Sequence, residues 1–418
     1  MSFEAELTRC PRPFNPERGV ETAALVHGVA PAISALIVGA AGSSPYLANL
    51  VAKEADWIAS AFDNPNSAVE TELAACLSCG YDVVGSRLRQ AKRRIALLTG
   101  LADLGGVWSL EEVTGTLSRF ADTATTAAIR ASIAQQIKRG KLPGQGINDI
   151  ETAGGMVALA MGKMGANELN YSSDIDLICL FDETRFDAND FADARMGFVR
   201  ATRVMTALLS DLTGEGYVFR TDLRLRPDPS ATPVCIAMEA AERYYESLGR
   251  TWERAAFIKA RSAAGDIEAG DRFLKTLGPF VWRRHLDFAA IQDAHDMRLA
   301  IRQHKGLGGQ ITLAGHNMKL GRGGIREIEF FTQTRQLIAG GRDPELRMKG
   351  TREGLAGLAQ KEWIAPELAK TLSNHYVAHR TVEHRLQMVR DAQTHNLPTS
   401  EAEFDRLAAL MDMNRSDL

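Results

Sequence analysis

The feature that most constrains the fold is a pair of aspartates at the start of an apolar run, in "ELNYSSDIDLICLFD" (residues 168–182). Residues 175–181 have the length and composition of a buried strand. Asp174 lies just before this segment, and Asp176 is its second residue. Residues i and i+2 of a strand project from the same face, so both carboxylates lie on one side. Burying carboxylates is costly unless a proton or cation compensates them. The pattern therefore predicts a strand whose acidic end binds a cation.

A second strand is predicted from the alternation in "YVFRTDLRLRP" (residues 217–227), which Pro227 ends. Apolar and polar side chains point to opposite faces. The first set is Phe219, Thr221, Leu223 and Leu225; the second is Arg220, Asp222, Arg224 and Arg226. Asp222 is thus a candidate third carboxylate, although a salt bridge to Arg220 or Arg224 is the alternative.

Three carboxylates on neighbouring strands suggest a magnesium site. Mg²⁺ takes oxygen ligands and commonly uses one or two carboxylates together with substrate phosphates. A set of three can hold two ions, the arrangement that stabilises both the entering and the leaving oxygen in phosphoryl-type transfer. Asp174, Asp176 and Asp222 are therefore the candidate catalytic residues and metal ligands, although an aspartate pair of this spacing alone also occurs in caps and turns.

Composition limits the kind of protein this is. A chain of 418 residues with 45% hydrophobic content exceeds one compact core, so two or three domains are expected. A net charge of −3 argues against nucleic-acid binding through a bulk positive field. The apolar stretch 23–42 contains His27 and Pro31, which favours a buried helix over a membrane span. We expect a cytoplasmic protein that binds neither nucleic acid nor membrane.

Patterning divides the chain into three regions. Residues 1–148 show helical spacing, including a capping box at Ser109 and Glu112. Residues 149–340 contain the strand candidates, with a helical insert at about 237–305. Residues 341–418 are again helical and end without a compact finish, which suggests truncation from a longer chain. The predicted fold is α+β and predominantly helical, with a small mixed sheet flanked by helical regions.

Two further segments have the character of anion sites. Gly162, Lys163 and Gly165 follow a predicted strand, where backbone N–H groups can approach phosphate oxygens; a simple tight turn is the alternative. Lys319 and Arg322 lie just before a predicted helix start at residues 323–324, and a helix N-terminus favours anions. Arg224 and Arg226 are phosphate-clamp candidates, or else solvated edge charges.

Three blocks together carry a family resemblance: "GKMGANELNYSSDIDLICLFD", "FRTDLRLRPDPS" and "KLGRGGIREIEF". They resemble the glutamine synthetase adenylyltransferase/adenylyl-removing enzymes, which belong to the polymerase-beta-like nucleotidyltransferases, and the likeness covers nearly the whole chain. Full-length members carry two such domains. The sequence at residues 168–177 and 323–330 resembles that of the N-terminal, deadenylylating half of these enzymes.

The resemblance implies a phosphorolysis in which inorganic phosphate removes AMP from a tyrosine of adenylylated glutamine synthetase and forms ADP. It implies Mg²⁺, ADP or ATP and phosphate as ligands, a PII-type signal protein as partner of the full-length chain, and nucleotide contacts from Ser173 and the basic residues above. Many superfamily members have Gly-Ser where this chain has Gly162 and Lys163, so Lys163 itself is the candidate to replace the serine's phosphate contact.

Two other functions remain open. Adenylyl transfer from ATP to the same tyrosine is the opposite activity of the family. The sequence of the motifs disfavours this activity. A non-catalytic docking module is the other possibility, although an idle site has no need to keep three mutually repelling carboxylates.

Overall fold

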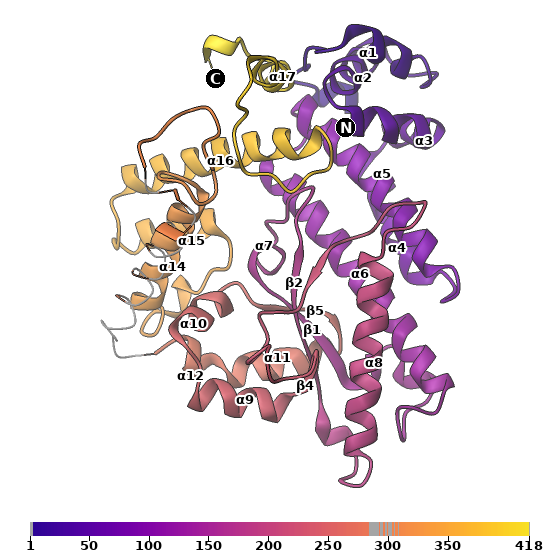
Figure 1. Cartoon of the computed structure of the whole chain (residues 1–418), viewed down its shortest axis with the longest axis vertical. Coiled ribbons are helices and arrows are strands. Elements are labelled where there is room, and N and C mark those ends of the chain that lie inside the picture. The colour runs from indigo at the N-terminus through magenta and orange to yellow at the C-terminus, as the bar shows by residue number, and fades with distance from the viewer. Residues whose placement is uncertain are drawn as a thin grey trace.

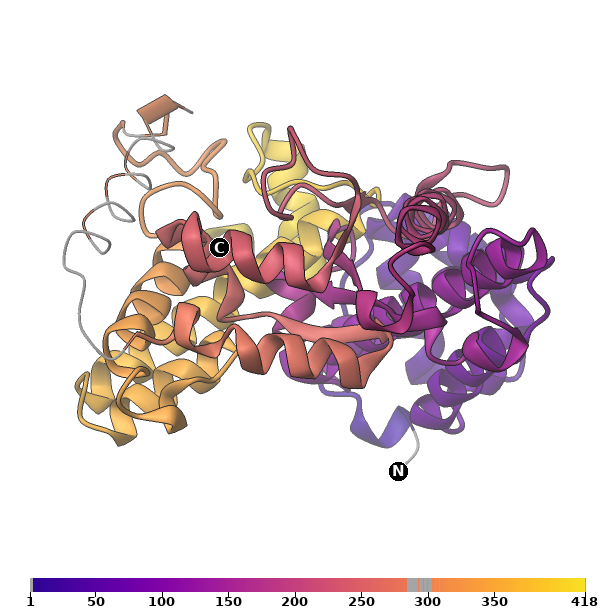
Figure 2. The same ribbon diagram turned by 90° about the horizontal axis from the view of Figure 1, so that it is seen from below.

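The computed structural model describes residues 3–283 and 309–417, together with positions 292, 296, 299, 303, 304, 306 and 307 between these ranges. Helices surround one small mixed sheet (Figure 1). The N-terminal helices, in indigo and purple, lie on one side of the sheet-bearing region, and helices α14 (Ile325–Ala339) and α15 (Thr351–Gln360), in orange, lie on the opposite side (Figure 2). The predicted fold class, α+β and mainly helical, is confirmed.

The N-terminal region is a set of six α-helices, and its local sequence explains where they begin. Prolines start the first four, at the position where a missing N–H costs no helical hydrogen bond. The predicted capping box, Ser109 with Glu112, is confirmed at the start of the sixth. The helices are α1 (Pro16–Ala23), α2 (Pro31–Ser43), α3 (Pro45–Ala61), α4 (Pro65–Ser78), α5 (Val84–Gly105) and α6 (Leu110–Lys138).

The sheet is built around its second strand. Strands β1 (Met156–Ala160) and β2 (Ile175–Phe181) are antiparallel, and β5 (Arg261–Gly265) joins the other edge of β1, also antiparallel. Strands β3 (Thr221–Asp222) and β4 (Cys235–Ala237) both pair with β2 in parallel, near its beginning and its end respectively. The acidic start of β2 therefore has β3 beside it.

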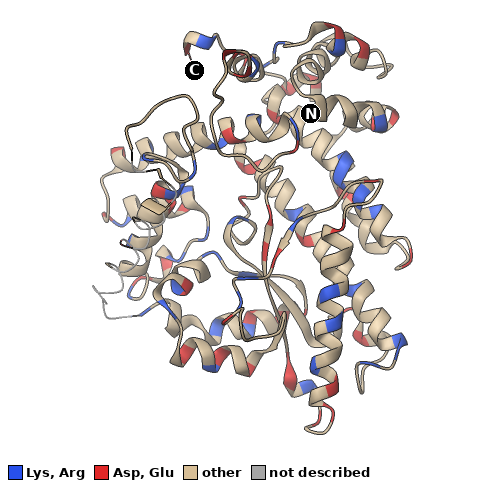
Figure 3. Ribbon diagram, in the orientation of Figure 1, with Lys and Arg blue, Asp and Glu red and all other residues tan. Residues whose placement is uncertain are grey.

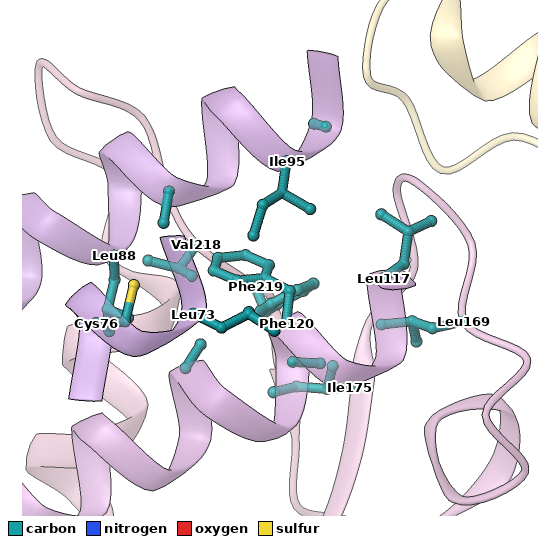
Figure 4. Packing of buried hydrophobic residues seen from close by; sticks show 14 of the residues in the cluster. Leu73, Cys76, Leu88, Ile95, Leu117, Phe120, Leu169, Ile175, Val218 and Phe219 are labelled. Atoms are coloured by element: carbon teal, nitrogen blue, oxygen red, sulfur yellow. The ribbon is translucent and has the colours of Figure 1, made fainter. Parts of the chain in front are cut away.

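The two faces of the sheet bury different cores. Ile175, Leu177, Cys179 and Phe181 belong to a large core shared with the N-terminal helices. Figure 4 shows Ile175, Phe120 and Phe219 within that packing. Alternate residues of β1 and β2 face a second core, which they share with helices α9 (Met238–Ser247), α10 (Thr251–Phe257), α11 (Ile267–Thr276) and α12 (Gly278–Val281).

The predicted strand over residues 219–225 is much shorter than expected. Only Thr221 and Asp222 pair with β2. The Asp222 carboxylate accepts a hydrogen bond from the backbone N–H of Arg224 at 2.8 Å, a local turn that takes the chain out of the ladder. As a result Leu223 packs against the large core and Leu225 against the second core, rather than both on one face.

The predicted helical insert, residues 237–305, lies partly outside the described residues. Its described part contains strand β5 in addition to helices, so it is not helical throughout. The region boundary expected near residue 148 falls between α6 and β1, yet the large core spans both sides of it. The division into domains therefore stays a prediction.

The remaining helices frame the sheet. A third core lies between α14, α15 and α16. None of the helices within the described ranges is both long and apolar enough to cross a membrane. The bounds are α7 (Gly162–Gly165), α8 (Phe191–Ser210), α14 (Ile325–Ala339), α15 (Thr351–Gln360), α16 (Pro366–Met388) and α17 (Glu401–Met411).

Candidate active site

The site begins where the apolar cover of the sheet ends. Asp176 follows the same alternation as Ile178 and Leu180, which face the second core, but it lies towards the open start of β2. The parallel pairing of β2 with β3 places Asp176 directly opposite Asp222. Two of the three predicted carboxylates are thus brought side by side by strand register.

Asp176 has an unfavourable environment for a negative charge. Burial, followed by the negative charges of Asp222 and Asp174, raises its pKa to about 6, although Lys319 and Arg326 act in the opposite direction. Within the described part of the chain, no hydrogen bond to the Asp176 carboxylate is formed. A carboxylate in this state is well suited to accept a cation.

The other two carboxylates are held by arginines. Asp174 accepts a hydrogen bond from Arg220 Nε at 2.7 Å and another from Gln393 Nε2 at 3.2 Å. Asp222 binds Arg224, with Nη2 to Oδ2 at 2.5 Å, and this hydrogen bond lowers the pKa of Asp222. The salt bridge considered as the alternative for Asp222 is therefore present.

These pairs bear on the predicted metal site. Among the residues that the structure describes, no three His, Cys, Asp or Glu side chains gather closely enough to hold a metal ion. Asp176 and Asp222 fit a divalent ion best, because they lie in register and no cation of the described residues forms an ion pair with Asp176. Binding of Mg²⁺ by all three carboxylates stays a prediction.

The glycine turn after β1 supports Asp176. Gly162 has φ +54°, and a Cβ added there would lie 3.0 Å from Asp176 Oδ2. At Gly165 a Cβ would lie 2.1 Å from the carbonyl oxygen of Lys259 and 2.6 Å from that of Ala160. Both positions thus require glycine, and the predicted phosphate contacts of the turn remain a prediction.

Lys163 is a buried cation at this turn. Its Nζ lies 3.4 Å from Glu383 Oε1 on α16. Burial lowers the pKa of Lys163 to about 7, helped by Arg380 and Lys319, whereas Glu383 raises it. A lysine with a pKa of about 7 is only partly charged at neutral pH. Because Glu383 raises this pKa, the candidate role of Lys163 as a phosphate contact depends on Glu383.

The loop before α14 places a further cation near the carboxylates. The positive charge of Lys319 acts on both Asp176 and Lys163. The loop is shaped by Asn317 Oδ1, which accepts hydrogen bonds from the backbone N–H groups of Lys319 and Leu320. Arg322, in contrast, is exposed, so its predicted ligand contact stays untested.

The remaining predicted contacts are arranged differently from one another. Ser173 is partly exposed just before β2, next to Asp174. Arg224 has 83% of its side chain exposed and is available to ligand at the rim of the site. The guanidinium of Arg226 instead donates to the carbonyl oxygens of Leu223, Pro229 and Thr232. Arg226 therefore holds its own loop, and its role as a phosphate clamp stays a prediction.

The motif residues just before the aspartates are structural. Glu168 accepts hydrogen bonds from Lys259 Nζ at 2.8 Å and from the backbone N–H of Thr351 at 2.6 Å. Asn170 is buried and its Oδ1 binds Arg380. The partners Lys259, Thr351 and Arg380 come from three different parts of the chain. The motif therefore connects the segment that leads into β2 with three distant segments.

Residues of α16 and the loop that follows it were missed by sequence reasoning. Gln393 donates to Asp174, and His395 Nδ1 lies 2.7 Å from Glu383 Oε1, the same atom that Lys163 contacts. These residues are more than 200 positions from the aspartates and form no local pattern with them. Of these residues only Glu383 lies in the periodic helix α16 (Pro366–Met388), where a polar residue on a buried face is a local signal; Gln393 and His395 follow the helix and give none.

Comparison with known proteins identifies the family of this chain. Residues 26–276 match the glutamate-ammonia ligase adenylyltransferase family, and residues 294–418 match the GlnD PII-uridylyltransferase family. Adenylyltransferases and uridylyltransferases are both nucleotidyltransferases, so the two matches indicate one class of protein. The first match covers more than half of the 418 residues. The chain belongs to the glutamate-ammonia ligase adenylyltransferase family, which confirms the resemblance drawn from its motifs.

Several curated relatives carry the name bifunctional glutamine synthetase adenylyltransferase/adenylyl-removing enzyme. The protein from Agrobacterium fabrum is 45% identical over 399 residues, which are 93% of this chain and 40% of the relative. That from Rhizobium meliloti is 52% identical over 326 residues, 78% of this chain and 33% of the relative. The chain thus spans about two-fifths of the length of the relatives it matches.

Proposed function

We propose that this chain catalyses phosphorolytic deadenylylation of glutamine synthetase and thereby takes part in the control of nitrogen assimilation. An oxygen of inorganic phosphate bonds to the AMP phosphorus, and the bond from that phosphorus to the tyrosine oxygen breaks. ADP is released, and the phenolate takes up a proton to restore tyrosine. The relatives' name includes an adenylyl-removing activity. The sequence of the motifs at residues 168–177 and 323–330 favours that activity over adenylyl transfer for this chain.

The observation that carries the proposal is the register of Asp176 with Asp222 at the open end of an apolar sheet face. Mg²⁺ held by Asp176 and Asp222, with Asp174 as a further ligand, would neutralise phosphate charge and steady the leaving phenolate. The chain's own residues bring the anions together. Lys319 acts on Asp176, and Lys163 lies in the glycine turn whose Gly162 adjoins Asp176; in this proposal both supply positive charge for the attacking phosphate.

This chemistry needs no strong general base. Inorganic phosphate is already anionic at neutral pH, and a phenol with a pKa of about 10 leaves readily. The demand is to overcome repulsion between two anions and to align them, which fixed cations do in phosphoryl transfer generally. A site made of carboxylates for metal and lysines for phosphate suits that demand.

The partners follow from the proposal. Adenylylated glutamine synthetase is the protein substrate, and ADP and inorganic phosphate are the small ligands. The match of residues 294–418 to a family described as a PII-uridylyltransferase supports a PII-type signal protein as a regulator of the full-length protein.

The test is to incubate this chain with adenylylated glutamine synthetase, Mg²⁺ and isotopically labelled inorganic phosphate. Labelled ADP, with the label in its β-phosphoryl group, is the expected product. The matched variants are Asp176→Asn and Asp56→Asn, the latter an exposed carboxylate on α3. Only the first should abolish ADP formation. Pyrophosphate released from ATP, with no labelled ADP, would overturn the proposal in favour of adenylyl transfer.

A further inference from the structure

A groove lies along the exposed side of α8. Its volume is about 540 Å³, and it is lined by α8 and by the loop that precedes β4. Its lining includes Arg195, Met196, Arg200, Arg203, Thr232 and Pro233. Figure 3 shows several basic bands along α8. The groove thus combines positive charge with a partly apolar floor.

Helix geometry places the three arginines on one side of α8. At 100° per residue, positions 195, 199, 203, 196 and 200 spread over an arc of about 140°. The buried residues, such as Phe198, Met205 and Leu209, occupy the other side, towards the large core. The three arginines are therefore exposed on the side of α8 that lies away from most of the core, although Val199 between them packs against the edge of that core.

None of the ion pairs formed within the described residues involves Arg195, Arg200 or Arg203. Elsewhere on the surface, by contrast, Arg243 binds Glu239 one helical turn away. The chain carries a net charge of −3, so three uncompensated arginines around one hollow depart from its overall balance. Charge of this sign attracts an acidic ligand.

The groove is connected to the catalytic strand by one loop. Asp222 of β3 begins this segment, and Thr232 and Pro233 at its far end form a wall of the groove. Arg226 ties the loop together through hydrogen bonds to the carbonyl oxygens of Pro229 and Thr232, the latter at 3.1 Å. A ligand in the groove therefore lies against the loop that carries an active-site carboxylate.

We propose that this arginine groove binds an acidic polypeptide segment of the protein substrate; the inference rests on the proposed function. Arg195 and Arg203 are separated by about 12 Å along the helix axis, at 1.5 Å per residue. A chain with several carboxylates matches that span and also covers Met196 and Pro233. One phosphate group does neither. The groove holds the substrate protein while its modified tyrosine reaches the carboxylates.

The test measures binding without turnover. Affinity for adenylylated glutamine synthetase is determined by surface plasmon resonance in the absence of phosphate, for the chain and for the variant Arg195→Ala/Arg200→Ala/Arg203→Ala. We expect about tenfold weaker binding in the variant, since three solvent-exposed charge pairs each contribute modestly. An octaglutamate peptide should compete for binding, and inorganic sulfate, an anion that cannot support turnover, should not compete at the same charge concentration.

The control variant Lys53→Ala/Lys138→Ala/Arg139→Ala removes the same charge from exposed positions elsewhere. Its affinity should equal that of the unaltered chain, and circular dichroism should show both variants folded. Equal affinity of the groove variant, or equal weakening in both variants, would overturn the inference, as would competition by sulfate. A chain that binds through the groove but forms no ADP would refute the proposed function while leaving the docking surface intact.

Discussion

Two groups of buried charge in this molecule differ in how their carboxylates are paired. At the junction between α5 and α16, Asp103 binds His384 Nδ1 at 3.0 Å and Arg385 Nη1 at 2.9 Å. Burial alone would raise the pKa of Asp103, but Arg385 and His384 hold it well below its usual range. At the start of β2, in contrast, Asp176 faces two other carboxylates, and its pKa is raised.

The difference distinguishes carboxylates that are neutralised by cations within the fold from Asp176, for which we propose a ligand. Glu329 and Lys259 form a second paired case, 2.8 Å apart, and burial is again outweighed, so that the pKa of Glu329 falls. Cations inside the fold complete both of those sites. At Asp176, in contrast, none of the described residues forms an ion pair with the carboxylate, which is the state expected of the ligand-binding centre that we propose.

The largest expected effect is on catalysis. Asp176→Asn should reduce the rate of ADP formation by a factor of about 10³ or more, since it removes an electrostatic contact to the reacting groups. Its thermal stability should be equal to or higher than that of the unaltered chain, because repulsion with Asp222 is relieved. A variant that loses activity only in proportion to a loss of folded protein would break the comparison.

The opposite pattern is expected at the paired junction. Asp103→Asn should lower the free energy of unfolding by about 3–5 kcal/mol, because it leaves buried Arg385 without its counter-charge. Thermal unfolding followed by circular dichroism measures this. Glu70→Gln, which breaks the exposed pair with Arg119, is the control and should change stability by about 0.5 kcal/mol or less. Equal effects of the two substitutions would contradict the account.

Stability should depend on pH through Asp176. The folded carboxyl keeps its proton up to a pKa of about 6, whereas the unfolded one releases it near 3.8. The folded state therefore loses stability as the pH rises from about 4 to about 6, and the loss persists above that range. In chelator-treated buffer, the melting temperature of Asp176→Asn should exceed that of the unaltered chain at pH 7, and the gap should close towards pH 4. A constant gap would refute the raised pKa.

The smallest expected effect sharpens the role of Lys163. Glu383→Gln removes the negative charge that raises the pKa of Lys163, so this pKa should fall below about 7. The KM for phosphate should then rise several-fold at pH 8, where the already small charged fraction of Lys163 falls in proportion to the drop in its pKa. It should rise less at pH 6, where much of Lys163 stays charged. Lys163→Met serves as the matched variant and should raise KM at both pH values. An increase in Glu383→Gln that is the same at both pH values would indicate a structural effect alone.

The sequence predicted the parts of the site that are local. Strand β2 with its aspartates, the capping box of α6 and the glycine turn all follow from short patterns. Strand β5 was missed because its residues, "RSAAG", are small and have low strand propensity. Small residues are needed there: a Cβ at Gly270 of α11 would lie 2.5 Å from Ser262 Oγ. The small residues of β5 are thus explained by close packing against α11, which strand propensities do not describe.

The rest of the site depends on contacts between distant segments. The predicted strand around Asp222 is only two residues long, because the Asp222 side chain bonds to the backbone of Arg224. Gln393 and Glu383 reach the site from the C-terminal part of the chain. A periodic helix such as α16 shows that some polar residues are buried, but only the fold shows which carboxylate or lysine they meet.

The most direct measurement is calorimetric titration of ADP into this chain with and without Mg²⁺, repeated with Asp176→Asn and with Asp56→Asn. The account predicts ADP binding that requires Mg²⁺, is lost in Asp176→Asn and is retained in Asp56→Asn. ADP binding of equal affinity without Mg²⁺, or in Asp176→Asn, would show that the unpaired carboxylate is not the metal and nucleotide site.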